Sequence, residues 1–212
     1  LGNRLSYIKD INLDFDEMAW RFCAVNVKDY EKIIRPRLKD ARFEHSKNVS
    51  KEAVRLAKKY GADVEKAAIA GILHDITKET SEEEQLEIMK KAGIELSPLE
   101  ANSTKLWHAI SGSGYIKIVL GIDDEDILNA VRYHTTARGG MSLLEKIIFI
   151  SDFTSAERDY DGVDEIRKAA DKSLEAAMIE GLSFSIEDLA HRRLAIAKDT
   201  LDAYNEVILK KK

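Results

Sequence analysis

The chain has 212 residues, of which 44% are hydrophobic and 33% charged, and its formal net charge is -5. Length and composition exclude a disordered or fibrous protein and predict a globular domain with a substantial core. The negative charge excludes a general attraction to nucleic acid or to an anionic membrane, so an anionic partner must meet a local cluster of Lys and Arg.

The cysteine content and the apolar runs bear on the compartment of the protein. A single cysteine, Cys23, excludes an intrachain disulfide and suits a reducing environment. No run reaches the roughly 18 apolar residues of a membrane span, and no signal-peptide pattern opens the chain. We therefore expect a cytoplasmic protein with no membrane and no nucleic-acid partner.

The chain divides into an N-terminal segment without motifs and a longer helical part. Residues 1–40 mix aromatic and charged side chains, and they predict a helical extension that packs on the domain or an appendage peculiar to this chain. In residues 41–212, apolar residues recur at spacings of three and four, which is the helix period. The predicted fold is all-α, a helical bundle, with helices expected near 45–60, 63–78, 81–92, 104–120, 123–134, 141–153, 162–180 and 185–209.

One predicted helix contains two polar groups that are costly to bury. The segment "AGILHDITKE", residues 70–79, is apolar on nearly every side, yet it includes His74 and Asp75. A buried, unpaired carboxylate is strongly unfavourable, so Asp75 needs a cation, a hydrogen-bonding partner or a metal. Because helix caps or a buried arginine would also satisfy the pair, the dipeptide alone leaves these interpretations open.

Other histidines and a second carboxylate also take core-facing positions. Three groups lie three or four residues from an apolar neighbour on the same helix face: His45, His134 and Asp152. His108 precedes the small residues "SGSG", which let a ligand or another helix approach closely. Imidazole and carboxylate are ligands that first-row divalent metals accept, so the pattern predicts a shared metal centre. His191 is followed by two arginines and is left out of this site.

The order of these residues resembles a known family. The pattern H...HD...H...H...D, formed by His45, His74, Asp75, His108, His134 and Asp152, is similar to the HD-domain superfamily of metal-dependent phosphohydrolases. More narrowly, "GILHDITK", "LWHAISG", "RYHT", "MSLLEKIIFISD", "GVDEIR" and "DTLDAYN" look like the bacterial YqeK family, symmetrical diadenosine tetraphosphatases. The resemblance covers about residues 40 to 206. The chain departs from the family in residues 1–40 and in "IAK" before the last motif.

The resemblance implies a metal site with defined roles. The principal metal would be bound by His45, His74, Asp75 and Asp152. A second metal, bridged by Asp75, or a substrate phosphate would be bound by His108 and His134. Iron is the expected metal because histidine-rich members of the superfamily often use it, with manganese, nickel or cobalt as alternatives. Asp75 is also placed to accept a proton.

Phosphoryl transfer needs cations around the phosphate oxygens. Lys78, at the same predicted helix end as His74 and Asp75, is the first candidate and the second predicted catalytic residue. Further candidates lie near the proposed ligands, although surface arginines are common: Arg42, Arg138 and Arg158.

Several uncharged residues are candidates for the nucleoside. Tyr133 and Thr135 would meet ribose or base, and a core tyrosine and a helix-ending threonine are the alternatives. The segment from Thr200 to Asn205 is similar to the family segment that closes over the nucleoside.

The predicted function is hydrolysis of diadenosine tetraphosphate to two ADP, by attack of metal-activated water on an inner phosphorus. One alternative is a general HD nucleotidase or phosphodiesterase for dNTPs, nucleoside monophosphates or cyclic nucleotides. Another is a metal- and nucleotide-binding sensor without turnover. The substrate is expected to be a dinucleoside polyphosphate or another nucleotide. The sequence is compatible with a homodimer and does not decide the oligomeric state.

Overall fold

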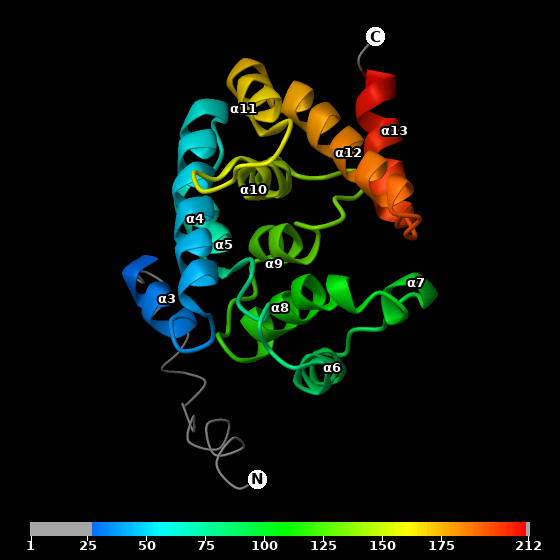
Figure 1. Cartoon of the computed structure of the whole chain (residues 1–212). Helices are drawn as coiled ribbons and strands as arrows, with labels where there is room; N and C mark the ends of the chain where they lie inside the picture. The colour runs from blue at the N-terminus through cyan, green and yellow to red at the C-terminus, as the bar shows by residue number, and fades with distance from the viewer. Residues whose placement is uncertain (1–26, 211–212) are drawn as a thin grey trace, which may run out of the picture.

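The computed structural model describes residues 27–210, and every regular element in this range is a helix (Figure 1). The predicted all-α class is confirmed. Among the described helices, none is long and apolar enough to cross a membrane. In chain order the elements are α3 (Val27–Ile34), α4 (Asp40–Tyr60), α5 (Val64–Leu73), α6 (Glu82–Lys91), α7 (Pro98–Ala101), the 3-10 turn η2 (Thr104–Leu106), α8 (Trp107–Ile118), α9 (Glu125–Arg132), α10 (Leu143–Thr154), α11 (Val163–Lys172), α12 (Leu174–His191) and α13 (Lys198–Lys210).

Helix α5 lies at the centre of the fold, and α3, α4, α9 and α10 pack against it. All residues from Ala67 to Leu73 are buried, as expected for a helix that is apolar on every side. Asp63 caps the helix by accepting hydrogen bonds from the amides of Glu65 and Lys66, at 2.9 and 3.0 Å. Because α5 is capped at its start and buried along its length, its C-terminal end after Leu73 lies in the interior.

Helices α4 and α5 approach each other closely at Gly71. A Cβ atom at this position would lie 2.7 Å from Cα of Ser50, so the approach requires glycine. The Ser50 hydroxyl donates a hydrogen bond to the carbonyl of Ala68 at 2.9 Å, which satisfies a buried polar group between the helices. Because His45 lies on α4 and His74 directly follows α5, this contact brings the two histidines together.

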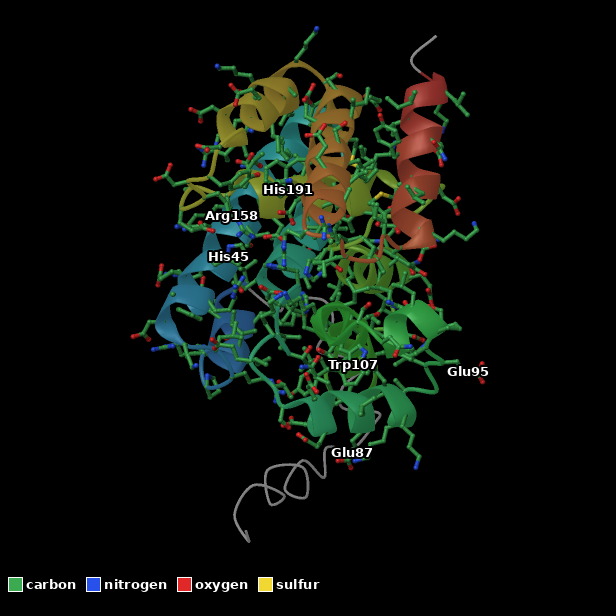
Figure 2. All side chains as sticks on the ribbon, turned by 45° about the vertical axis from the view of Figure 1, so that its right-hand side comes forward. His45, Glu87, Glu95, Trp107, Arg158 and His191 are labelled. Atoms are coloured by element: carbon green, nitrogen blue, oxygen red, sulfur yellow. The ribbon has the colours of Figure 1, made fainter. Side chains whose placement is uncertain are left out.

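A smaller core lies between α6 and α8, and it is formed by Met89, Trp107 and Ile110. Figure 2 shows Trp107 inside the fold and Glu87 on the outer side of α6. The indole nitrogen of Trp107 donates to the carbonyl of Glu100 at 2.8 Å and anchors the segment before α8. Helix α8, which carries His108, also packs on α9.

Three predicted helices end early or are divided in the structure. The helix expected at 63–78 ends at Leu73, and turns follow it. The helix expected at 162–180 is divided at Ser173, whose backbone is extended and whose hydroxyl caps α12. The helix expected at 185–209 is interrupted after His191, where Arg193 takes a positive φ of 56°. Periodicity continues across such breaks because it reports the buried face and not the backbone conformation.

The N-terminal segment predicted as an extension is described only from residue 27. In this part, α3 packs on α5, and Tyr30, Ile34 and Leu38 join the main core. The prediction for residues 1–26 lies outside the described residues.

Candidate metal centre

The turns after α5 place His74 and Asp75 side by side in the interior. His74 is the C-terminal cap residue of α5, and the amide of Lys78 donates to the carbonyl of Asp75 at 2.9 Å. His74 is fully buried and Asp75 is 2% exposed. The helix therefore ends at the site, and its last residues face the other ligands.

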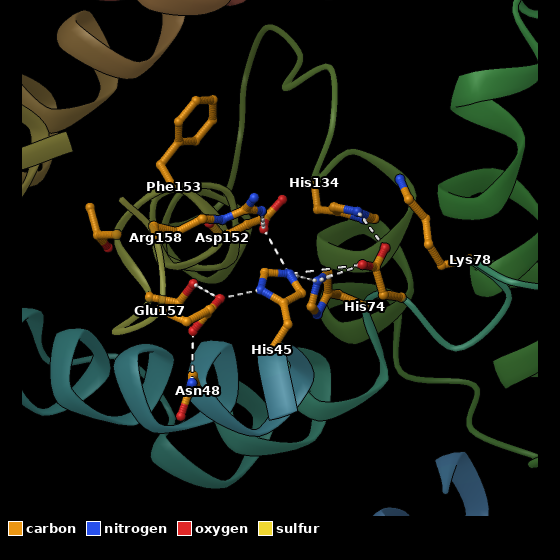
Figure 3. A network of polar contacts seen from close by, with 12 residues as sticks. His45, Asn48, His74, Lys78, His134, Asp152, Phe153, Glu157 and Arg158 are labelled. Atoms are coloured by element: carbon orange, nitrogen blue, oxygen red, sulfur yellow. Dashed lines mark hydrogen bonds and ion pairs between the residues drawn. The ribbon is translucent and has the colours of Figure 1, made fainter. Parts of the chain in front are cut away.

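Six side chains from different elements converge here, as Figure 3 shows for most of them. On one side, Nε2 of His45 lies 3.2 Å from Nε2 of His74 and 3.0 Å from Oδ1 of Asp152. On the other side, Nε2 atoms of His108 and His134 lie 3.3 Å apart. These are the six residues that the sequence pattern singled out.

Asp75 lies between the two halves of the cluster. Its Oδ2 is 3.5 Å from Nε2 of His74 and 3.8 Å from Nε2 of His45. Its Oδ1 is 3.4 Å from Nε2 of His108 and 3.6 Å from Nε2 of His134. Within the described part of the chain, this buried Oδ1 has no hydrogen-bond partner. The carboxylate can therefore serve two cations at once.

The hydrogen bonds at Nδ1 define the tautomers of three histidines. Nδ1 of His74 lies 2.8 Å from the carbonyl of Gly71, and Nδ1 of His134 lies 2.8 Å from the carbonyl of Val131. A carbonyl only accepts, so both Nδ1 atoms carry a proton, and when the rings are neutral each presents an Nε2 lone pair to the cluster. Nδ1 of His45 meets a carboxylate oxygen of Glu157 and has the same tautomer.

This donor set fits a divalent cation. Nε2 of His45 faces both Nε2 of His74 and the carboxylate oxygen of Asp152, and a shared cation could bind all three atoms. Among residues 27–210, two groups of side chains could hold an ion: His45, His74 and Asp152, and His74, Asp75 and His134. Nitrogen and carboxylate oxygen together suit iron, manganese, cobalt, nickel and zinc.

The surroundings of the cluster shift the pKa values of its carboxyl groups and of one imidazole toward the forms that bind metals. Burial raises the pKa of Asp75, but the facing imidazoles, His74 foremost, hold that pKa well below its usual range. Burial likewise raises the pKa of Asp152, and His45 and Arg158 lower it well below the usual range. Burial lowers the pKa of His108 to about 3, so this imidazole is neutral at physiological pH. Carboxylates that are ionised and imidazoles that are neutral can all coordinate a metal.

Three of the predicted cations lie at this cluster. Arg42 donates to Oδ2 of Asp75 at 2.8 Å, and Arg158 pairs with Oδ1 of Asp152. Nζ of Lys78 lies 3.1 Å from Nε2 of His108. Burial lowers the pKa of Lys78 although Asp75 opposes the effect. Positive charge thus surrounds the two carboxylates, as an anionic substrate requires.

The other predicted substrate residues lie at the end of α9, in the segment after it, or in α13. Arg138 makes two hydrogen bonds to the buried Glu145, at 2.6 and 3.0 Å, and its guanidinium lies 4.8 Å from the ring centre of Tyr133. Thr200 is buried and donates to the carbonyl of Thr136 at 2.7 Å. Thr135 is half-buried and Asn205 is exposed. His191, which the sequence pattern left out, is exposed at the end of α12.

Sequence reasoning missed Glu157 and Asn48. Oε1 of Glu157 contacts Nδ1 of His45, and Oε2 accepts a hydrogen bond from Asn48 at 2.7 Å (Figure 3). Burial raises the pKa of Glu157, but His45 and the other donors outweigh it and lower the pKa to about 2. The signal was weak, because Glu157 is one of several acidic residues in "AERDYDG".

Comparison with known proteins decides the family. The family model described as "HD domain" matches residues 42–183. The chain belongs to the HD-domain family. It is 37% identical over 180 residues to a Halalkalibacterium halodurans protein named "Bis(5'-nucleosyl)-tetraphosphatase, symmetrical", with 85% of this chain and 96% of the relative covered. A Bacillus subtilis protein of the same name is 37% identical over 175 residues, with 82% and 94% covered.

A solved structure agrees with these relatives. The structure of a Clostridium acetobutylicum protein, entitled a "predicted HD superfamily hydrolase involved in NAD metabolism", superposes with a TM-score of 0.84. The two proteins are 39% identical, and the match covers 88% of this chain and 98% of the other. The resemblance to the YqeK branch of HD hydrolases, drawn from the sequence motifs, is thereby confirmed.

Proposed function

We propose that this HD-domain protein is a metal-dependent hydrolase that cleaves diadenosine tetraphosphate symmetrically into two ADP. The observation that carries the proposal is the convergence of four imidazoles and two carboxylates on one buried centre, in a chain related over most of its length to proteins named symmetrical bis(5'-nucleosyl)-tetraphosphatases. The substrate is a dinucleoside polyphosphate, and its phosphates meet the metal centre.

The principal cation would be held by His45, His74, Asp75 and Asp152. Oδ2 of Asp75 faces this group, whereas Oδ1 faces His108 and His134, which bind a second cation or a substrate phosphate. Iron is the proposed metal, and manganese, nickel and cobalt fit the same donors. A bound divalent cation lowers the pKa of water and polarises a phosphoryl oxygen.

The cations of the chain would hold the tetraphosphate. Arg42 and Arg158 each lie next to a ligand carboxylate, so each can turn part of its guanidinium to a phosphate oxygen. Lys78 approaches from the side of His108 and would stabilise charge on the leaving ADP. Because its pKa lies below the usual range, Asp75 stays ionised and would serve as a metal ligand more readily than as a proton acceptor.

The nucleoside would lie on the side of Tyr133. The ring of Tyr133 is half-buried and has the guanidinium of Arg138 beside it, an arrangement that accepts a stacked base. Glu145 fixes Arg138, so this arginine would contact the substrate with its planar face or its remaining N–H groups. Thr200 would act indirectly by holding the backbone next to Thr135. Asn205 is exposed on α13 and would reach a ribose from outside.

Product analysis tests the reaction. Metal-loaded protein would be incubated with diadenosine tetraphosphate in isotopically labelled water, and the products separated by chromatography. We expect only ADP, with the label in one of the two molecules formed. ATP plus AMP would refute symmetrical cleavage, and a strong preference for a dNTP would favour the general nucleotidase.

Substitutions connect the reaction to the centre. His74→Ala and Asp75→Ala should lose bound metal and activity together, because each removes a ligand that neighbouring groups cannot replace. His191→Ala is the matched control, since this histidine is exposed and outside the cluster. Full metal content and activity in the two ligand variants would show that the catalytic centre lies elsewhere.

A further inference from the structure

Glu157 receives three hydrogen bonds although its side chain is 35% exposed. Its Oε1 faces Nδ1 of His45 and accepts from the hydroxyl of Ser155 at 2.7 Å, while Oε2 accepts from Asn48 at 2.7 Å. An ordinary surface carboxylate makes fewer and looser contacts. The convergence of donors from α4 and from its own turn shows that Glu157 is held in one orientation, aimed at His45.

The position of His45 in its helix explains why its Nδ1 donates to a side chain and not to a backbone carbonyl. His74 and His134 follow the ends of α5 and α9, where the last carbonyls have no partner within the helix and can accept from Nδ1. His45 lies inside α4, where the preceding carbonyls are used by the helix itself. Its Nδ1 therefore needs an acceptor from outside α4, and Glu157 provides it.

The turn that carries Glu157 is itself fixed. The amide of Arg158 donates to the carbonyl of Ser155 at 3.0 Å, closing the turn. From α11, Arg167 donates to the carbonyls of Ser155 and Arg158 at 3.0 and 2.8 Å. The next residue after Glu157, Arg158, pairs with Asp152. Two consecutive residues of one rigid turn thus contact two ligands of the same proposed ion (Figure 3).

We propose that Glu157 is a positioning residue that holds His45 in the tautomer and orientation needed to bind the metal. This inference rests on the proposed metal centre. A carboxylate that accepts the distal N–H of a ligand histidine keeps the coordinating nitrogen unprotonated and makes it more basic. Glu157 does not touch the metal or the substrate, and it acts through His45.

The test measures metal affinity and the state of His45 separately from activity. Metal-free wild type, Glu157→Ala and Glu157→Gln would be titrated with Mn²⁺ in competition with a chromogenic chelator. We expect Glu157→Ala to bind about 10 to 100-fold more weakly. Glu157→Gln keeps an acceptor oxygen and should lose less. Nitrogen NMR of the imidazoles should show His45 protonated at Nδ1 in the wild type and shifted toward the other tautomer in Glu157→Ala.

A matched control variant and two different contrary results separate the role of Glu157 from the existence of the metal centre. Glu44→Ala removes a carboxylate next to His45 in sequence that pairs with Lys47 and does not contact the site, so its affinity should equal that of the wild type. Thermal unfolding of the metal-free proteins checks that each variant is folded. A folded Glu157→Ala with wild-type affinity and tautomer overturns the inference alone. A wild type that binds no divalent cation overturns the proposed metal centre as well.

Discussion

Replacing Gly71 by alanine tests whether the contact between α4 and α5 builds the metal centre. The new Cβ would lie 2.7 Å from Cα and 3.1 Å from the amide nitrogen of Ser50, both backbone atoms that cannot rotate away. Carbon atoms in contact lie about 3.5–4.0 Å apart, so the helices must separate locally by about 1 Å. His45 and His74, whose Nε2 atoms are 3.2 Å apart, would move apart with them.

The expected magnitude follows from two opposing effects. Alanine is favoured over glycine inside a helix by about 1 kcal/mol. Overpacking costs about 1–3 kcal/mol, and the upper part of this range applies because the clash is with backbone. We expect the free energy of unfolding to fall by about 1–2 kcal/mol, and metal affinity to fall as well.

The assay is urea unfolding of the metal-free variant, followed by titration with metal. Gly181→Ala is the matched control, because Gly181 lies on α12, which carries no proposed ligand, and its Cβ would meet only side-chain atoms, those of Ile150 and Phe149 at 3.4 Å and of Phe153 at 3.9 Å. The control should be unchanged or more stable. If Gly71→Ala behaves like Gly181→Ala in both measurements, the helix contact does not set the spacing of the ligands.

Three further predictions concern stability. Asp63→Ala should lower the free energy of unfolding by about 1 kcal/mol in urea denaturation, because α5 loses its N-terminal cap, whereas Asp63→Asn should retain most of it. A divalent metal at a hundred times its Kd should stabilise the protein by about 2.7 kcal/mol, seen as a rise in Tm of roughly 5–10 °C that a chelator reverses; an unchanged Tm would count against the metal centre. Burial raises the pKa of Asp124, but Lys66 and the amides it caps lower it below the usual value. Its contribution is therefore complete above about pH 4 and is lost as the pH falls through the folded-state pKa, so the stability difference between wild type and Asp124→Asn, measured by urea unfolding, should shrink in acid; a constant difference would contradict this.

The centre of the fold and the ligand set could be read from local patterns. Helical periodicity identified the buried stripe of α4 and the fully apolar α5, and His45, His134 and Asp152 were found because each continues such a stripe. A polar group on a buried face is costly in any all-α arrangement, so the local pattern already implied that these groups meet partners.

Helix breaks and the roles of single side chains were harder to predict. The divisions at Ser173 and after His191 depend on local backbone geometry, which an apolar period does not report. Arg138 was predicted to meet phosphate, and only the structure reveals that its guanidinium donates hydrogen bonds to the buried Glu145. Thr200 was expected in the segment that closes over the nucleoside, and only the structure reveals its hydrogen bond to the carbonyl of Thr136.

The sequence by itself determined the helical class, the family and the six residues of the cluster, because these depend on residue type and on spacing along one helix. Tertiary structure decided how the cluster is organised. The division of the two oxygens of Asp75 between two pairs of histidines depends on how α4, α8 and α9 pack around the end of α5. The contact of Glu157 with His45 joins residues 112 positions apart. Such a contact exists only once α4 and the turn after α10 are packed together, since hydrogen bonds act over a few ångströms in space and not along the chain.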